Sequence, residues 1–467
     1  MKRTLITILC LSLGLSAFAA SEVESYTYSP KVEVSQKYAM KVNGIPVTVL
    51  QDVEPDFAIF GAKGEVDVEI TLLQGTMDSL IVRPQAKGYK YSFKDNKIPL
   101  KLKTGDRVSV EPNHSTDKSL LIFVNPLEAK LIKKLENNPK VRMFKAGEIY
   151  EEGHIKLKDG ETFYIQGGAI VKGFIGMMKA PQTTAITIDG GGILDNREWD
   201  GIHHEKRNPV RIDNSDGLVV ENITVLNQDY WTFYTVNCDD CLIRNVKLIG
   251  TFTHKPDGTG NEDDGFDICS SHHVTVEGCF AYAHDDAFCV KSSTPTLTRL
   301  AKDIHFKDCV AWNVDSGNSF EIGYRVAGGV EDIYYEDIYA IHSGHRPGSH
   351  FRRSGLSIHQ GSPGYIKNVH YKNVHIEDPQ EFSININVFK TPYKTYEWAP
   401  GEISNVTIDG LYIYKKAPDG GVIKGYDAEH MTRNVVISNY YLEGKKVTSL
   451  EEADFSDTSF SEGIVIK

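Results

Sequence analysis

Short segments of alternating apolar and polar residues recur along most of the chain and share one form. Each unit reads apolar, polar, then Asn, Asp or Gly, then apolar, and copies begin at positions 188, 220, 243, 276, 306, 335, 371, 408 and 437. The spacings between these positions run from 23 to 37 residues, and no helical periodicity lies between them. A period of this length is typical of a solenoid in which each repeat forms one coil.

The repeat therefore predicts an all-β fold, a right-handed parallel β-helix over residues 143–467. In such a solenoid each coil pairs with the coils above and below it, so the ladder hydrogen bonds run along the axis. Asn, Asp and Gly tolerate the left-handed backbone of a tight corner, which explains the third position of each unit. The apolar neighbours are expected to stack inside, including Cys279 and Cys309, which share a repeat position.

A different pattern precedes the repeats. Residues 21–142 contain short alternating stretches separated by turn residues, such as 45–50 and 66–72, and only 128–138 has helical character. This spacing predicts a small antiparallel β-sandwich domain. Residues 1–20 combine a basic start, a short apolar stretch and an Ala-Phe-Ala site, the pattern of a signal peptide. We therefore expect export, to a periplasm or by secretion, and no membrane span, because no second long apolar run follows.

Composition and charge narrow the class of partner. The 467 residues include 51 Lys and Arg against 63 Asp and Glu, a formal net charge of −12, without a basic block. Nucleic acid is therefore not an expected partner, because it requires clustered cations. Six cysteines remain beyond the signal peptide, and we expect buried thiols, with disulfides as the alternative for an exported chain. Their spacing gives no zinc site, and we expect no metal or cofactor.

One acidic segment departs from the solvated charges usual on the outside of a solenoid. Carboxylates crowd residues 261–268 and again 284–288, and Asp264 and Asp286 are 22 residues apart, about one coil. They should therefore lie on adjacent rungs, about 4.8 Å apart. Stacked like charges destabilise a sheet, and crowding raises some of their pKa values, which supplies an acid and a base for glycosidic hydrolysis. A calcium site and corner residues without a role are the alternative interpretations.

These acidic segments also resemble a known family. Asp264-Gly265-Phe266-Asp267, then Asp285-Asp286 and Lys291, are similar to the polygalacturonase signature, which reads Asn-Thr-Asp-Gly-x-Asp, Asp-Asp and a downstream Lys. The resemblance covers roughly residues 145–440. It implies a parallel β-helix glycoside hydrolase of the inverting type, acting on a polysaccharide or oligosaccharide. Carried over position by position, it implies Asp286 as the general acid, with Asp264 and Asp285 activating water.

Two motifs differ from those of that family. Asn318 lies in a Gly-Asn-Ser sequence where the family has Gly-His-Gly, and His359 ends a Ser-Ile-His sequence where the family has Arg-Ile-Lys. The family's Arg and Lys face the galacturonate carboxylate, so their loss favours a neutral or differently held sugar. The chain is also similar to dextranases and isopullulanases, which combine an N-terminal sandwich with a β-helix and cleave neutral α-glucans.

The outer groove supplies further candidates. The expected substrate-binding residues are His284, Lys291, Asn318, Glu321, Arg325 and His359. Tyr230, Trp231 and Trp312 are candidates for stacking on sugar rings, with core packing as the alternative for each. A basic segment from His342 to Arg353 would favour an anionic sugar if it folded over the groove.

Two other functions remain open from the sequence. A polysaccharide lyase on the same scaffold would use Lys291 as its base. A non-catalytic carbohydrate-binding protein would use the solenoid as an extended face, with Asn318 and His359 marking lost catalysis.

Overall fold

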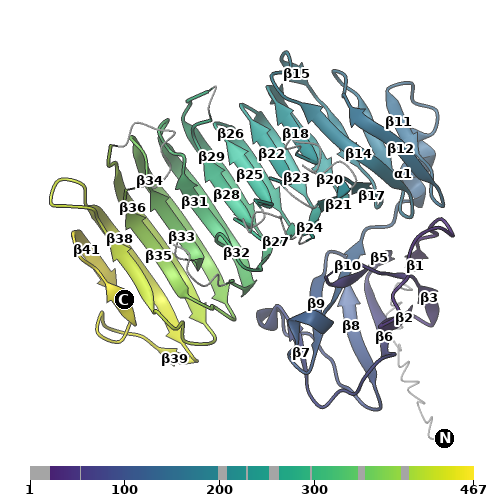
Figure 1. The fold of residues 1–467 in the computed structure, drawn as a ribbon, viewed down its shortest axis with the longest axis horizontal. Helices are drawn as coiled ribbons and strands as arrows, with labels where there is room; N and C mark the ends of the chain where they lie inside the picture. The colour runs from purple at the N-terminus through teal and green to yellow at the C-terminus, as the bar shows by residue number, and fades with distance from the viewer. Residues whose placement is uncertain are drawn as a thin grey trace, which may run out of the picture.

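The computed structural model describes residues 22–52, 54–197, 208–227, 230–251, 262–294, 297–344, 353–390 and 399–467. Its regular structure is almost entirely β, arranged as an N-terminal sandwich beside a long solenoid (Figure 1). The predicted signal peptide lies outside these residues. Within them, no helix has the length and apolar character needed to cross a membrane.

The N-terminal module is a β-sandwich of two sheets. The larger sheet contains β1 (Glu22–Ser25), β4 (Val49–Leu50), β5 (Asp56–Lys63), β7 (Leu80–Arg83), β9 (Arg107–Pro112) and β10 (Leu120–Asn125). The smaller sheet contains β2 (Tyr38–Val42), β3 (Ile45–Val47), β6 (Glu65–Leu72) and β8 (Lys97–Lys103). Short 3₁₀ turns η1 (Gln85–Lys87) and η2 (Thr116–Lys118) and helix α1 (Ala129–Leu135) complete the module.

Alternating burial explains why these segments pair into two layers. In β6 every second residue, such as Val66, Val68 and Ile70, enters the core between the sheets, as the sequence pattern predicts. β5 and β10 are buried along both faces, because one face meets the smaller sheet and the other meets the solenoid. The sequence predicts an antiparallel sandwich, but these two strands pair in parallel, so the larger sheet is mixed.

The solenoid is a parallel β-helix with three faces. The first face contains β11 (Val141–Phe144), β13 (Thr162–Ile165), β16 (Thr187–Asp189), β20 (Val219–Glu221), β23 (Asp239–Arg244), β26 (His272–Glu277), β29 (Ala301–Lys307), β32 (Val330–His342), β34 (Tyr365–Ile376), β36 (Glu402–Ile413), β38 (Thr432–Leu442) and β41 (Ser461–Ile466). The second face contains β12 (Ile149–Ile155), β14 (Ile170–Met177), β17 (Ile193–Asp195), β21 (Thr224–Asn227), β24 (Lys247–Gly250), β27 (Phe280–Ala283) and β30 (Val310–Asn313), and the second half of β32 continues it.

The third face carries the acidic segments of the sequence. It contains β18 (Val210–Asp213), β22 (Phe233–Val236), β25 (Phe266–Cys269), β28 (Phe288–Lys291), β31 (Phe320–Tyr324), β33 (Ser354–Gln360), β35 (Phe382–Val388), β37 (Gly421–Lys424) and β40 (Phe455–Asp457). Three short strands lie outside this scheme: β15 (Thr183–Thr184) pairs with β19 (Ser215–Asp216), and β39 (Lys445–Lys446) pairs with β38.

The corners between the first and second faces follow the repeat. The third residue of the unit has a positive φ, for example 64° at Asn222, 52° at Asn245 and 51° at Asp308. Adjacent corners are tied by side-chain hydrogen bonds, as where Asn245 Nδ2 donates to Asn222 Oδ1 at 2.9 Å. The Asn, Asp or Gly position of the motif is thus explained by backbone geometry.

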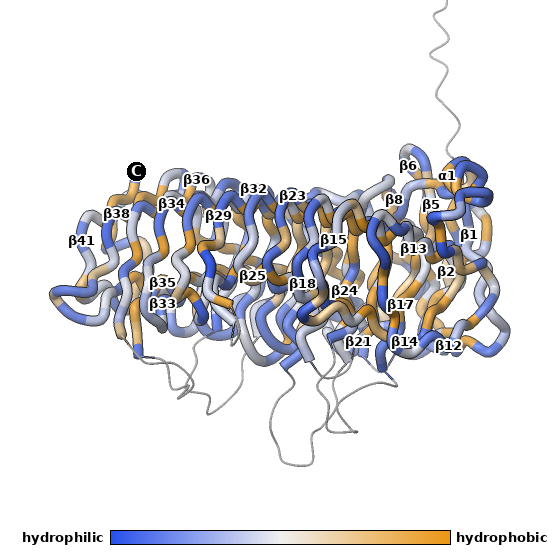
Figure 2. Tube along the Cα trace, turned by 90° about the horizontal axis from the view of Figure 1, so that it is seen from above, coloured by the Kyte–Doolittle hydropathy of each residue, from blue (hydrophilic) through white to orange (hydrophobic). Residues whose placement is uncertain are grey.

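The interior is filled by side chains that stack from coil to coil. Phe266, Phe288 and Phe320 form a continuous stack, with ring centroids 5.0 and 5.2 Å apart. Hydrophobic positions recur at the same place in successive coils along the length of the solenoid (Figure 2). Cys279 and Cys309 occupy equivalent positions, and all six cysteines of the described chain are buried free thiols.

The sandwich packs on the outside of the second face of the solenoid. Phe57, Ile59 and Phe123 of the sandwich form one apolar cluster with residues such as Phe280 and Trp312. Phe123 meets Phe280 edge-on, with ring centroids 5.1 Å apart. This contact places the loop between β4 and β5 beside the turns that carry the acidic residues.

Candidate active site

Two successive turns of the third face carry the predicted catalytic carboxylates. Asp264 precedes β25 and Asp286 precedes β28, and these strands pair with Phe266 opposite Phe288. The Gly265 amide donates to the Asp286 carbonyl at 2.8 Å. Asp264 and Asp286 therefore occupy the same position on adjacent coils, as the spacing in the sequence predicts.

We call Asp264 and Asp286, with Asp285 beside Asp286, the acidic column, and Asn318 continues it on the next coil. Its backbone amide and its Nδ2 both donate to Asp286 Oδ1, at 2.8 and 3.0 Å. The Ser354 amide, one coil further, donates to Asn318 Oδ1 at 3.0 Å. Asn318 is only 1% exposed, so its side chain orients Asp286 rather than lining the outer surface.

Asp285 is the most accessible of the three candidate carboxylates. Asp264 and Asp286 are 3% and 5% exposed, whereas Asp285 is partly exposed. Two hydrogen bonds hold Asp285 in place. Its Oδ1 accepts a hydrogen bond from the Asp286 amide at 3.0 Å, and its carbonyl oxygen accepts one from Asn313 Nδ2 at 2.7 Å. This position leaves the Asp285 carboxyl group best placed to meet a substrate.

The three carboxyl groups differ in proton affinity. Burial and the charge of Asp286 raise the pKa of Asp285 well above its usual range. Burial and the charge of Glu321 raise the pKa of Asp286 to about 6, against the opposing hydrogen bond from Asn318. Burial and the charge of Asp267 also raise the pKa of Asp264. Adjacent carboxyl groups with different proton affinities can act as an acid and a base in one site.

Lys291 lies beneath this group in an ion-pair network. Its Nζ is 3.2 Å from Asp264 Oδ2, contacts the Asp267 carboxylate, and lies 4.6 Å from the centre of the Trp231 ring. Burial alone would lower the pKa of Lys291, but the carboxylates of Asp267 and Asp264, with the Cys289 thiol, outweigh it and hold that pKa well above its usual value. Lys291 is therefore a fixed positive charge that balances part of the acidic cluster.

Glu321 and His359 form a second buried pair on the following coils. Glu321 pairs with Ser357 in the register of β31 and β33, and its carboxylate accepts a hydrogen bond from the Ser357 hydroxyl. His359 Nδ1 lies 2.9 Å from Glu321 Oε2. Ser357 and His359 are the residues found here in place of the Arg and Lys of the polygalacturonase signature, and both contact the Glu321 carboxylate.

The remaining predicted binding residues are distributed around this core. His284 is 1% exposed and lies between two carboxylates, so it is enclosed rather than on the groove surface. Arg325 is partly exposed, and its guanidinium lies 5.0 Å from the centre of the Trp231 ring. Trp231 thus has a cation from each of two coils against it, Arg325 and Lys291. Their contacts with substrate remain predictions.

Two of the weaker sequence candidates belong to the module interface instead. Trp312 packs in the apolar cluster beneath the sandwich. His342 Nε2 lies 3.0 Å from Glu111 of β9, and its Nδ1 lies 3.1 Å from Asp378. Within the basic segment, residues 345–352 lie outside the described part of the chain. Arg353, the last residue of that segment, is buried and donates to Ser316 Oγ at 3.2 Å.

Three residues outside the predicted catalytic and substrate-binding set shape the site, and of these Arg353 was considered only as part of the basic segment. Arg353 supplies a positive charge that opposes the raised pKa of Asp285, and Asp263 supplies a negative charge that adds to it. Glu54, from the sandwich, reaches His284. The position of Asp263 beside Asp264 was a usable signal, whereas nothing in the sequence links Glu54 to a segment 230 residues away.

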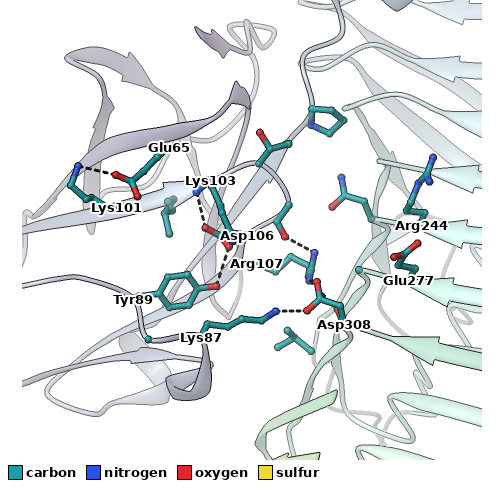
Figure 3. A pocket seen from close by; sticks show the side chains of 18 of the residues that line it. Glu65, Lys87, Tyr89, Lys101, Lys103, Asp106, Arg107, Arg244, Glu277 and Asp308 are labelled. Atoms are coloured by element: carbon teal, nitrogen blue, oxygen red, sulfur yellow. Dashed lines mark hydrogen bonds and ion pairs between the residues drawn. The ribbon is translucent and has the colours of Figure 1, made fainter. Parts of the chain in front are cut away.

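A cleft of about 600 Å³ opens between the two modules, away from the acidic column. Figure 3 shows the charged side chains that line it, of which Lys87 and Arg107 pair across the junction with Asp308. Arg107 Nη2 of the sandwich lies 2.6 Å from Asp308 Oδ2 of the solenoid, and Lys87 contacts the same carboxylate. The cleft contains no predicted catalytic residue, and the two ion pairs made by Asp308 join the modules. Among the described residues, no group of three or more His, Cys, Asp or Glu side chains is arranged to hold a metal ion.

Comparison with known proteins identifies the family of the chain. The family model "Glycosyl hydrolases family 28" matches residues 147–452, which include every member of the acidic column. The chain belongs to glycosyl hydrolase family 28. This family-28 chain is 25% identical over 232 residues to the polygalacturonase of Saccharomyces cerevisiae, covering 48% of this chain and 58% of that protein. It is 22% identical over 355 residues to exopolygalacturonase B of Aspergillus niger, covering 70% and 72%.

The matches to relatives are partial, and the structural likeness extends further. Across three of the polygalacturonases, including the yeast protein, the match covers 37–58% of their length, so this family-28 chain spans about half the length of these relatives. Dex49A from Penicillium minioluteum has a similar fold, with a TM-score of 0.57 at 15% identity, covering 95% of this chain and 96% of the other. That likeness extends through both the sandwich and the parallel β-helix.

Proposed function

We propose that this protein is an exported glycoside hydrolase that cleaves a polysaccharide or oligosaccharide with inversion at the anomeric carbon. The observation that carries the proposal is the column formed by Asp264 and Asp286 on adjacent coils, with Asp285 beside them and Asn318 orienting Asp286. Membership of family 28 and the polygalacturonase relatives support it.

The site geometry favours one change to the roles implied by the sequence resemblance. Asp286 accepts two hydrogen bonds from Asn318, which stabilise its ionised form and suit a base. Asp285 is more accessible and its pKa is raised well above its usual range, which suits a proton donor to the glycosidic oxygen. We therefore assign Asp285 as the general acid, with Asp286 and Asp264 activating the attacking water.

Two alternative functions fit the site less well. A lyase needs an unprotonated base, and Lys291 is kept protonated by the carboxylates of Asp264 and Asp267. A purely binding protein would not need Asn318 to orient Asp286 with two hydrogen bonds. Hydrolysis uses both features.

The substrate unit held near Glu321 is proposed to be neutral. Ser357 and His359 replace the family's Arg and Lys, and both contact the Glu321 carboxylate. A uronate placed there would meet a like charge in a buried setting, where repulsion between carboxylates is strong.

The substrate preference can be measured with a reducing-end assay on dextran, pullulan, polygalacturonate and rhamnogalacturonan. We expect activity on a neutral glucan, with polygalacturonate slower by at least about 10²-fold because the carboxylate would be unpaired. Asp286→Asn is the control and should abolish the signal. NMR of the first products should give the inverted anomer. Equal or faster cleavage of polygalacturonate would refute the neutral-sugar assignment while leaving the hydrolase intact.

The pH dependence follows from the assigned roles. Asp286 must be ionised to act as a base, and its pKa is about 6, so kcat should rise as the pH increases through about 6. Activity should fall at higher pH, when Asp285 loses the proton that it donates. If kcat instead declines as the pH rises through 6, Asp286 would be the general acid and Asp285 the base.

A further inference from the structure

The N-terminal sandwich reaches the candidate active site through one side chain. Glu54, in the loop between β4 and β5, has its Oε1 3.1 Å from His284 Nε2. Its Oε2 accepts a hydrogen bond from the Tyr282 hydroxyl of β27. His284 itself is 1% exposed, so this contact is enclosed within the protein.

The other nitrogen of the same imidazole continues the contact toward the acidic column. His284 Nδ1 lies 2.8 Å from Asp263 Oδ2, and Asp263 is fully buried. Burial alone would lower the pKa of His284, but the carboxylates of Asp263 and Glu54 outweigh it and raise that pKa well above its usual value. With both nitrogens facing carboxylates, the ring is a doubly hydrogen-bonded cation. Besides these acids it faces the Tyr282 ring, 5.8 Å away, and Asp285 follows it in sequence.

Two members of this bridge, Asp263 and His284, are each attached by one peptide bond to a proposed catalytic residue. Asp263 precedes Asp264, and His284 precedes Asp285. Glu54 also lines a pocket of about 640 Å³ whose wall includes Asn313, the residue that holds the Asp285 carbonyl. A shift of the imidazole would therefore move the backbone of two neighbouring turns at once.

A second bridge of the same chemistry provides an internal comparison. Glu111 of the sandwich lies 3.0 Å from His342 Nε2, and His342 Nδ1 lies 3.1 Å from Asp378. Both bridges join a sandwich carboxylate, a solenoid histidine and a solenoid aspartate. Only the Glu54 bridge adjoins the proposed catalytic residues along the chain.

We propose that Glu54 is a positioning residue for catalysis, so that the sandwich module completes the active site rather than only flanking it. Glu54 holds His284 as a cation, and His284 fixes Asp263 and the turns that present Asp264 and Asp285. This inference rests on the proposed hydrolase function for its kinetic consequence, while the bridge itself is testable without a substrate.

The kinetic test compares matched variants of the full chain on the substrate found in the reducing-end assay. Glu54→Gln should lower kcat by about 10-fold and Glu54→Ala by up to about 100-fold, the range for a residue that orients a catalytic group, with KM changing less than about twofold. Glu111→Gln removes the corresponding charge from the other bridge and should keep the wild-type kcat. Thermal unfolding of all three variants separates a loss of folded protein from a loss of positioning.

A second readout does not depend on turnover. In protein labelled with ¹⁵N-histidine and ¹³C-carboxyl aspartate, the His284 ring should be fully protonated at pH 7.5, and Glu54→Gln should lower its titration midpoint by at least about one pH unit. The carboxyl signal of Asp285 is assigned as the one that disappears in Asp285→Asn. The titration midpoint of this signal should shift in Glu54→Gln and stay unchanged in Glu111→Gln.

Each failure has a separate meaning. If the wild-type chain hydrolyses none of the glycans but the His284 and Asp285 signals respond to Glu54→Gln, the proposed function fails and the bridge stands. If the wild-type chain is active, and the Glu54→Gln variant has the same kcat as the wild type and an unchanged Asp285 signal, the positioning role is refuted. Equal loss of kcat in Glu54→Gln and Glu111→Gln would also refute it, because the effect would then be one of stability.

Discussion

Asp285→Asn should lower kcat on the natural substrate by about 10³-fold, with little change in KM, because it removes the proton donor to the leaving oxygen. Asp285 is the most accessible carboxylate of the column, and its pKa is raised by burial and by Asp286. The substitution is nearly isosteric, so the fold should be retained. The measurement is the initial rate of reducing-end formation at saturating substrate.

An activated substrate distinguishes the acid from the base. A dinitrophenyl glycoside has a leaving group that needs no proton, so Asp285→Asn should cleave it with a loss of less than about tenfold. Asp286→Asn should be impaired on both substrates, because water activation is needed in each case. If Asp286→Asn is the variant that the activated substrate rescues, Asp286 is the acid, as the sequence resemblance alone implies.

Gly317→Ala should reduce kcat by about 10²-fold, because it displaces the Asp285–Asp286 peptide. Gly317 has a φ of +69°, and a Cβ atom built there would lie 2.3 Å from the Asp286 nitrogen and 2.4 Å from Asp285 Oδ1. Backbone atoms cannot yield as a flexible side chain can, so the turn itself must move. The measurements are kcat on the natural substrate and the thermal unfolding midpoint.

Gly444→Ala is the matched control for this substitution. Gly444 has a similar φ of +77°, but a Cβ atom added there would have no neighbour within 4 Å, so the variant carries the left-handed strain alone. It should unfold at a lower temperature than the wild-type protein, as we also expect of Gly317→Ala, and keep its kcat. A Gly317→Ala protein with normal kcat would show that the Asp pair tolerates movement of this turn.

The repeat in the sequence was sufficient to predict the architecture, because in a β-helix the local pattern and the tertiary contacts coincide. The third position of each unit requires a positive φ, and residues such as Asn222, Asn245 and Asp308 adopt it. The 22-residue offset between Asp264 and Asp286 places them on adjacent coils, since each coil pairs with the next in register. The acidic column was therefore visible in the sequence.

The partners of these acids depend on contacts that no local pattern records. Asn318 was predicted to bind substrate, with lost catalysis as the alternative, and no local pattern indicated its two hydrogen bonds to Asp286. His284 looked like a groove residue and is instead enclosed between Asp263 and Glu54. The raised pKa values of the three carboxyl groups follow from burial and from neighbouring charges, such as Glu321 beside Asp286.

The solenoid, its corners and the set of acids could be predicted from the residues alone, because they follow from a repeat that each coil satisfies with its neighbours. The docking of the sandwich, the residue that orients Asp286, and the contact of Glu321 with Ser357 and His359 emerged only from the folded chain. These features depend on hydrogen bonds and charges, which act through space and not along the sequence. Glu54 and His284 are 230 residues apart in the chain, and their side chains meet at 3.1 Å.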